Sequence, residues 1–409
     1  MTGTTHRGIP RLLLTLLFTA GCEFPYAPQP LISSQKQRST DTVTNFAATG
    51  TLYPVNRGMQ TCNPSVSRSE RYPACMLWLG FSDLAVTVPD SLTAYAATPV
   101  RLHDRLTITD TANTVRWYLL RSEIASSGEL QCPEWSTHSD YLACLVGKVT
   151  RPYSGYAVRL SDHASLLICN NTLEEFSTPH LWLPDSAVQG ATVPQPVFDE
   201  NGIAVKEDVE RFFGTRRIRF VYTRSGGDGA VHVLDYSAGE QPLPIALRKP
   251  EGLEKWYCNS PLISPDGNWV AYHCYPNAAQ GAYYRSFIQR LTPDALPVEI
   301  ADEASDPHWW REPDDPEQYY IVYTRTDGPY YSENEYTDPA IAASGAIGAT
   351  MLQKLTGTWR EVPAFIGTLQ PDPSENPITL VQLPFKGGLS RDGRFLCTAY
   401  KYAYLLELK

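Results

Sequence analysis

The stretch "PLISPDGNWVAYHC" (residues 261–274) contains the pattern that decides the fold. An apolar segment leads into Ser-Pro-Asp-Gly, and a segment rich in β-branched and aromatic residues follows. Proline presets φ and glycine tolerates positive φ, so the tetrapeptide suits a tight turn. The stretch therefore predicts two antiparallel strands joined by that turn.

The same arrangement recurs along the chain. The copies are "PEWSTHSDYLAC" (133–144), "GGLSRDGRFLCTAY" (387–400), "PHWWREPDDPEQYYIVYT" (307–324), the weaker "PSVSRSERYPAC" (64–75) and, as the later strands of a sixth unit, "RRIRFVYTRSGGDGAVHVLDY" (216–236). Some copies continue into a third strand and a short fourth strand, as in residues 282–291 followed by "LPVEI". Four strands of this kind make one blade, and such repetition is typical of radial β architectures.

The copies "SPDGNWVAY" and "SRDGRFL" resemble the Ser-x-Asp-Gly repeat of TolB-type (WD40-like) β-propellers, which occur in many periplasmic and lipid-anchored envelope proteins. The resemblance implies an all-β propeller. We expect six blades, with five or seven as alternatives. The uneven spacing of the copies also allows a β-sandwich followed by a smaller sheet. The motif residues shape turns and pack blades, so the resemblance implies a fold and not a partner.

Composition agrees with a large β structure. The chain has 409 residues, 43% of them hydrophobic, with 24 Tyr, 9 Trp and 33 Pro against 4 Met. That is enough for a packed core, and the aromatic content favours strands over helices. The net charge of −10 argues against nucleic acid as the main partner.

The N-terminus predicts export and lipid anchoring. His6, Arg7 and Arg11 precede an apolar run, "LLLTLLFTA" (12–20), and Gly21-Cys22 follows. This run is too short for a permanent transmembrane helix and is typical of a secretory signal. Its end resembles the bacterial lipobox, in which the new N-terminal cysteine, here Cys22, is acylated. An ordinary cleaved signal is the alternative.

Three segments follow from these features. We expect a lipoprotein signal peptide at 1–21, a flexible tether at 22–56 and a propeller domain at 57–409. The tether contains several prolines and a Thr-rich stretch, and an edge strand in its second half is the alternative. In lipoproteins, Asp after the acylated Cys commonly signals inner-membrane retention, so Glu23 favours the outer membrane of a bacterial cell envelope.

Eight cysteines remain once Cys22 is set aside, and an exported chain meets an oxidising compartment. Residues equidistant from a hairpin turn face each other across two strands. Their spacing from the expected turns predicts three disulfides: Cys62–Cys75, Cys132–Cys144 and Cys258–Cys274. Cys169 and Cys397 are left as a default pair, and buried thiols are the alternative for every pair.

The sequence lacks several catalytic and cofactor motifs. It contains no Gly-x-Ser-x-Gly elbow, and its eight His include no His-Glu-x-x-His pattern or close pair. The glycine-rich "SGGDGA" (225–230) connects two expected strands, which favours a hairpin turn over a phosphate loop. We therefore expect no metal site and no cofactor.

One stretch invites an enzymatic interpretation. "ASDPHWWREPDDPEQYYIVYT" (304–324) resembles the blade starts of five-bladed propeller glycosidases, in which channel carboxylates act as acid and base. This resemblance implies Asp306 as the candidate and Glu312 as a weaker one. The favoured alternative is that Asp306 starts a blade strand, while Trp309 and Trp310 pack between blades.

A second candidate region is the aromatic, acidic loop "TDGPYYSENEYTDPA" (326–340). Tyrosines are efficient contact residues, so Tyr330, Tyr331 and Tyr336, together with Trp309 and Trp310, are candidates for binding. The alternative is a solvated insertion.

These observations predict a lipid-anchored cell-envelope propeller that binds or scaffolds an envelope protein or a polysaccharide. The alternative function is a surface glycoside hydrolase that uses channel carboxylates. The absence of recognisable catalytic motifs favours the binding module.

Overall fold

The computed structural model describes residues 47–58, 61–81, 84–148, 152–173, 178–187, 189–223, 228–276, 284–302, 304–311, 319–325, 346–354, 361–368, 385–398 and 403–408. Strands make up most of its regular structure. The α-helices are short: α1 (Thr93–Ala97), α2 (Arg121–Ile124) and α3 (Lys206–Phe213). Within the described ranges, no helix has the length and apolar character needed to cross a membrane.

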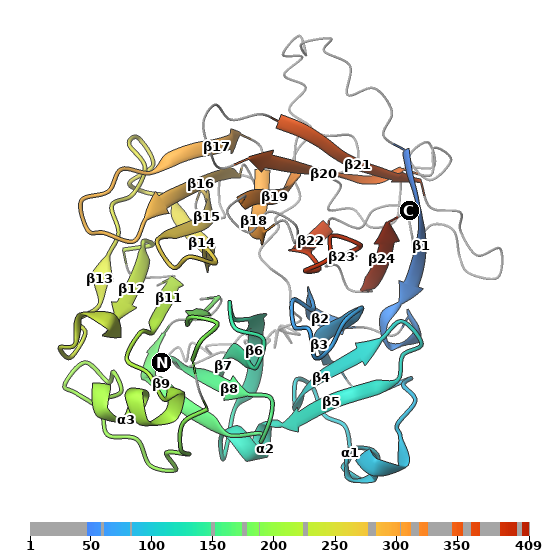
Figure 1. Cartoon of the computed structure of the whole chain (residues 1–409), viewed down its shortest axis with the longest axis horizontal. Helices are drawn as coiled ribbons and strands as arrows, with labels where there is room; N and C mark the ends of the chain where they lie inside the picture. The colour runs from blue at the N-terminus through green and yellow to red at the C-terminus, as the bar shows by residue number, and fades with distance from the viewer. Residues whose placement is uncertain are drawn as a thin grey trace, which may run out of the picture.

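Four separate four-stranded antiparallel sheets follow one another along the chain. They are β2 (Thr61–Val66), β3 (Cys75–Gly80), β4 (Arg105–Asp110) and β5 (Val115–Leu120); β6 (Glu129–Trp135), β7 (Tyr141–Gly147), β8 (Tyr153–Arg159) and β9 (Ser165–Leu173); β10 (His180–Trp182), β11 (Arg219–Thr223), β12 (Val231–Asp235) and β13 (Ile245–Ala246); and β14 (Tyr257–Ile263), β15 (Trp269–Tyr275), β16 (Arg285–Arg290) and β17 (Val298–Asp302). Figure 1 shows the sheets arranged in a ring, with first strands such as β2 and β6 nearest its centre.

The remaining strands form one eight-stranded sheet in the order β18-β19-β20-β21-β1-β24-β23-β22. They are β18 (Ala304–Arg311), β19 (Tyr319–Arg325), β20 (Ala346–Lys354), β21 (Glu361–Thr368), β22 (Phe385–Leu389), β23 (Phe395–Thr398), β24 (Tyr404–Leu408) and β1 (Ala47–Pro54). Strand β1 pairs antiparallel with β24 and parallel with β21, so the first strand of the chain joins the last ones. It lies inside segment 22–56, where an edge strand was the alternative to a tether.

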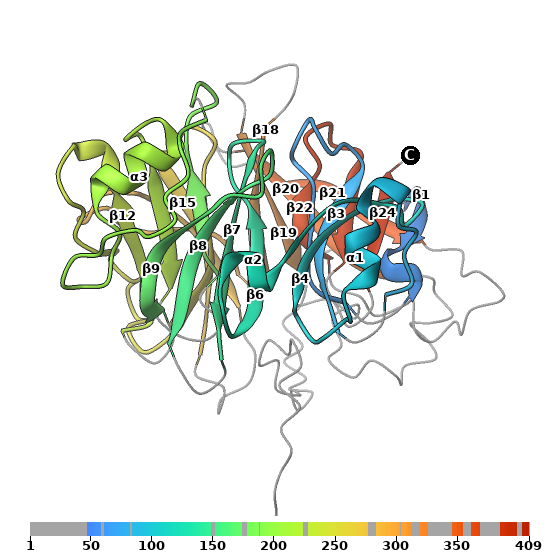
Figure 2. The same cartoon turned by 90° about the horizontal axis from the view of Figure 1, so that it is seen from below.

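The all-β propeller prediction is confirmed at the level of the fold. Four blades are separate sheets, and the other strands share one continuous sheet, so the count of six stays a prediction. Seen from the side, the sheets stand next to one another around the ring (Figure 2). Apolar clusters fill the space between neighbours; one of them joins Leu77 and Ile108 of the first sheet to Leu142 and Val158 of the second.

The Ser-x-Asp-Gly turns have the structure that the sequence predicts. The Ser264 hydroxyl donates to Asp266 and accepts a hydrogen bond from the amide of Trp269 at 3.0 Å. Gly267 closes the turn with φ of 77°. The second copy repeats the pattern: Ser390 Oγ donates to Asp392 and accepts from the Phe395 amide, and Gly393 has φ of 71°.

Each of these turns also accepts a hydrogen bond from a tryptophan of the neighbouring sheet. The Trp182 indole donates to the Pro265 carbonyl at 3.0 Å, and a Cβ on Gly267 would lie 2.4 Å from the Trp182 ring. Glycine is therefore needed here for its small size as well as for its φ. Trp310 repeats the contact at the other turn, because its indole donates to the Ser390 carbonyl at 3.0 Å.

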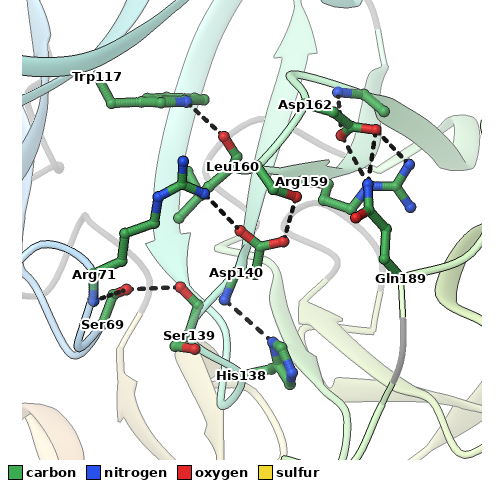
Figure 3. A network of polar contacts seen from close by, with 12 residues as sticks. Ser69, Arg71, Trp117, His138, Ser139, Asp140, Arg159, Leu160, Asp162 and Gln189 are labelled. Carbon is green, nitrogen blue, oxygen red and sulfur yellow. Dashed lines mark hydrogen bonds and ion pairs between the residues drawn. The ribbon is translucent and has the colours of Figure 1, made fainter.

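The first two sheets are joined by the polar network drawn in Figure 3. Asp140 accepts from Arg71 at 3.4 Å, and the hydroxyl of Ser69 donates to the Ser139 carbonyl at 2.8 Å. Further along, the Trp117 indole donates to the Leu160 carbonyl at 3.0 Å. Asp140 thus sits at a blade edge, where it connects two sheets.

Register decides which predicted cysteine pairs can form. Cys258 and Cys274 are directly opposite on β14 and β15, and their sulfur atoms are 2.8 Å apart. Cys62 is instead opposite Leu79, and Cys75 lies four residues before Leu79, at the start of β3. The Cys62–Cys75 prediction is wrong, because the strands pair in a register that the turn position did not indicate, and Cys75 is a thiol.

The structure also has the predicted pair Cys132 and Cys144 and the default pair Cys169 and Cys397 as thiols. A bulge at Cys132 shifts the alternation of β6, so Cys132 and Cys144 face different core clusters. Cys169 and Cys397 belong to different clusters as well. The structure has Cys258 and Cys274 as thiols too, so their disulfide remains a prediction.

Oxidation should therefore distinguish these pairs. When the unfolded chain refolds in a glutathione redox buffer, we expect a disulfide between Cys258 and Cys274, because they face each other across the strands. Peptide mapping without reduction checks this, with Cys132 and Cys144 as the matched pair that stays unlinked. Complete alkylation of Cys258 and Cys274 after refolding would contradict the prediction.

Candidate functional site at the propeller axis

Four inner strands are interrupted by an X-Pro dipeptide. Each strand shifts its register against its partner at this point, and the residue before proline has a positive φ. These residues are Asn63 (φ 45°), Cys132 (46°), Ser260 (49°) and Asp306 (49°). Proline has no N–H for the ladder, so a bulge is where an inner strand can hold it. Positive φ is costly for side chains and concentrates at functional positions.

The residues directly after two of these prolines meet across the ring. Glu134 Oε2 on β6 lies 3.7 Å from His308 Nε2 on β18. Strands β6 and β18 belong to sheets that are not neighbours (Figure 1), so their side chains reach each other through the centre. Both residues are buried. The bulges thus place polar groups on the axis of the propeller.

Glu134 is strongly held in its ionised form. Its Oε1 accepts from Ser65 Oγ at 2.8 Å and from the Trp135 amide at 3.0 Å. Burial acts to raise its pKa, but the contact with His308 and the charges of His308 and Arg68 outweigh it, together with the charge that His180 carries at the low pH where Glu134 titrates. The pKa of Glu134 is lowered to about 2. A carboxyl group with this pKa is an anion throughout the physiological range.

His180 contributes a neutral donor. It begins β10, is fully buried, and its Nδ1 accepts from the Ile263 amide at 3.0 Å. Burial lowers its pKa to about 3 although Glu134 acts in the opposite direction. The neutral ring then carries its proton on Nε2. That atom has no partner at hydrogen-bond distance, although the Trp135 backbone is near enough to affect the pKa.

Arg68 brings a cation to the same place. It follows β2, and its charge acts on both Glu134 and His180. Burial lowers the pKa of Arg68 against the opposing effect of Glu134, and arginine remains charged in proteins. Its Nε and Nη2 atoms are buried and have no hydrogen-bond partner among the described residues. A buried donor without a partner costs about 1–3 kcal/mol, so these two atoms are candidates for binding an acceptor.

The structure places Asp306 beside this cluster. Its carboxylate is buried, 3.5 Å from Ser260 Oγ and 4.0 Å from His273 Nδ1. The Asp306 amide donates to His273 Nδ1 at 3.1 Å, and the His308 ring donates from Nδ1 to the Asp306 carbonyl at 2.8 Å. Asp306 therefore lies at the bulge inside β18, and its carbonyl holds His308 in its orientation toward Glu134.

The other predicted site residues fall in different places. Trp309 is 2% exposed, and its indole donates to the Leu262 carbonyl at 2.8 Å, so it packs between sheets. Trp310 packs on the Ser390 turn. Four candidates and the lipid attachment site lie outside the described residues: Glu312, Tyr330, Tyr331, Tyr336 and Cys22.

Sequence reasoning missed Arg68, Glu134, His180 and His308. The signal was present in the repeat itself, in the residue that follows the proline of each copy. That column reads Ser65, Glu134, His180, Leu262 and His308. The copy "PHLWLPDS" (179–186) was not recognised, because α3 separates β10 from its partner strand β11 in the sequence. Among the described residues, no group of three or more His, Cys, Asp or Glu could hold a metal ion.

Of the comparisons with known proteins, the one with solved structures gives matches. No family model matches the chain, and no curated protein matches it. TolB from Acinetobacter baumannii aligns at 12% identity with a TM-score of 0.34, over 75% of this chain and 60% of TolB. The Dos1 propeller aligns at 9% identity with a TM-score of 0.35, over 74% of this chain and 73% of that one.

A puromycin-hydrolyzing peptidase of Mycobacterium tuberculosis aligns at 12% identity with a TM-score of 0.38. That alignment covers 69% of this chain and 37% of the peptidase. The chain thus spans less than two thirds of the length of TolB and of the peptidase. TolB and other propellers are among the structures that resemble it.

Glu134 should make stability depend on pH. Its pKa is about 2 against an ordinary 4.5, so it stabilises the fold above pH 4.5, and this contribution is lost as pH falls toward 2. This pKa difference contributes about 3 kcal/mol to the free energy of unfolding at neutral pH. We expect Glu134→Gln to lower the free energy of unfolding at pH 7 and to flatten its decline between pH 5 and pH 3. Urea unfolding measures this, with the exposed Glu200→Gln as control. Parallel pH profiles for wild type and Glu134→Gln would refute the assignment.

Proposed function

We propose that this chain is a lipid-anchored propeller of the bacterial cell envelope that binds a protein or a polysaccharide and does not catalyse a reaction. The observation that supports this function best is the axial cluster of Arg68, Glu134, His180 and His308. Glu134, His180 and His308 lie on strands of three different sheets and Arg68 follows β2 of a fourth, and the cluster contains buried donors that no described residue satisfies. Propellers commonly bind ligands at the centre of the ring or on its loop face.

The electrostatics of the cluster favour binding over glycoside hydrolysis. A hydrolase needs a carboxylic acid that is still protonated near neutral pH, which requires a raised pKa. Burial raises the pKa of Glu134, but contact with His308 and the nearby charges lower it to about 2, so it cannot donate a proton at that pH. Asp306 is packed against Ser260 and His273. The alternative pair of Asp306 and Glu312 therefore has no observation in its favour.

We further propose that the ring has six blades. In this interpretation the eight-stranded sheet consists of two blades, β18-β19-β20-β21 and β22-β23-β24-β1. The parallel contact of β1 with β21 involves three residue pairs, whereas β1 pairs with β24 over five. The N-terminal strand would then complete the last blade, so that the chain ends hold the ring closed.

Anchoring would occur through Cys22, on the outer membrane in our proposal. Two or three acyl chains give stable attachment, because each buried CH₂ contributes about 0.8 kcal/mol. In bacteria supplied with a labelled fatty acid, we expect label on the full chain and its recovery with membranes. Cys22→Ser should abolish both, and a variant that stayed labelled and membrane-bound would contradict the anchor.

Retention of a partner and release of reducing ends distinguish the binding function from glycoside hydrolysis. The full chain in a nonionic detergent is incubated with a panel of bacterial and plant cell-wall polysaccharides and with envelope extract. We expect retention of a partner without new reducing ends. Arg68→Gln should reduce retention, and the exposed Arg248→Gln is the matched control. Release of reducing ends that disappears in Asp306→Asn would instead establish the glycoside hydrolase.

A further inference from the structure

Three buried arginine guanidinium groups differ in how their donors are used. Arg105 donates to Asp104 and to the carbonyls of Tyr95, Thr98 and Pro99. Arg159 donates to Asp162 and to the carbonyls of Gly190 and Phe212. Arg68 leaves Nε and Nη2 without a partner. The fold satisfies its structural arginines, so the unused donors of Arg68 set this residue apart.

The two unused atoms have a specific geometry. Nε–H and Nη2–H lie on the same edge of the guanidinium plane and point in parallel. This edge matches the two oxygens of a carboxylate, which it binds by two charge-assisted hydrogen bonds. A single water molecule cannot satisfy both donors in this way.

His180 supplies a third donor in electrostatic range of Arg68. Its Nε2 is buried, and within the described ranges no acceptor lies at hydrogen-bond distance, although the Trp135 backbone is near enough to raise the His180 pKa, while Nδ1 is fixed by the Ile263 amide. The ring therefore presents an N–H donor and cannot easily turn away from the cluster. An oxygen-rich anion would satisfy this donor as well as those of Arg68.

The charge of the cluster selects among anions. The positive charge of Arg68 offsets the negative charge of Glu134, and the buried Asp306 carboxylate lies beside the cluster, so no positive charge is in excess. A monoanion gains the hydrogen bonds of Arg68 with limited repulsion from Glu134, whereas a dianionic phosphate is repelled more strongly. A planar carboxylate therefore fits better than a phosphate.

We propose that Arg68 and His180 bind a carboxylate group of the ligand at the propeller axis, with Arg68 contacting both oxygens through Nε and Nη2. This inference rests on the proposed binding function and names the ligand chemistry of that site. Small organic acids and uronic-acid sugars share this group. Arg68 as a residue is only partly buried, so the group is not sealed from solvent.

The test is titration of the full chain, in nonionic detergent, with sodium acetate, sodium galacturonate and inorganic phosphate, followed by calorimetry. We expect binding of acetate or galacturonate, and weaker binding of phosphate. Galacturonate alone would assign the source to an acidic sugar, and equal affinity for acetate would assign it to the carboxylate itself. Arg68→Gln should weaken carboxylate binding by about ten- to a hundred-fold, which is the loss of a charge-assisted contact.

Two further variants distinguish a loss of carboxylate binding from a loss of folding. Arg68→Lys retains the charge but loses the paired donors, so it should also weaken carboxylate binding by at least about five-fold. Arg248→Gln should match wild type. All variants are checked by thermal melting, and a crystal of the wild-type chain soaked in acetate provides a readout that needs no variant.

Carboxylate oxygens against Nε and Nη2 of Arg68 in that crystal would support the proposal. Water alone there, or no binding of either carboxylate to the wild-type chain, would overturn it. A chain that retains a polysaccharide or protein equally well with and without Arg68→Gln would overturn the carboxylate site and leave the binding function intact. Carboxylate binding without any retained macromolecule would support the site and contradict the proposed function.

Discussion

The rest of the structure depends on one backbone constraint, the proline inside the inner strands. Proline cannot donate to the ladder, so each of four inner strands breaks its register there, and the preceding residue takes a positive φ. A side chain in that region costs about 1–3 kcal/mol. The packing between sheets must outweigh this cost. The bulge directs the side chain of the residue after proline toward the axis, as it does for Glu134 and His308.

Burial and pairing act in opposite directions at the axis, and pairing prevails for Glu134. Ser65, from the first sheet, and His308, from the eight-stranded sheet, both contact its carboxylate. The contact with His308 joins two sheets that are not neighbours, so it connects the ring through its centre. The apolar clusters, in contrast, connect neighbouring blades. Removal of one partner would leave a buried charge uncompensated, which is more costly than loss of a surface ion pair. Arg68 is the exception, since no residue in the described part of the chain accepts from its Nε or Nη2.

Much of the fold could be predicted from the sequence, because turn chemistry is local. Ser264, Asp266 and Gly267 make the turn that their types predict, and Cys258 is opposite Cys274 as their spacing from that turn requires. The other cysteine pairs failed where a bulge or a different register intervened. Local composition does not indicate such shifts, although the recurring X-Pro dipeptides mark where they occur. The axial cluster was harder to predict, since Glu134 and His308 are far apart in sequence and become neighbours only when the ring closes.

The bulge residues are strained, and the ring holds them in place. Ser260→Gly and Ser260→Ala allow a matched comparison, because both remove the hydroxyl that donates to Asp306, and glycine alone tolerates the φ of 49°. The free energy of unfolding should be measured for both variants by urea denaturation. We predict that Ser260→Gly is more stable than Ser260→Ala by about 1 kcal/mol or more. Equal free energies of unfolding for the two variants would contradict the strain.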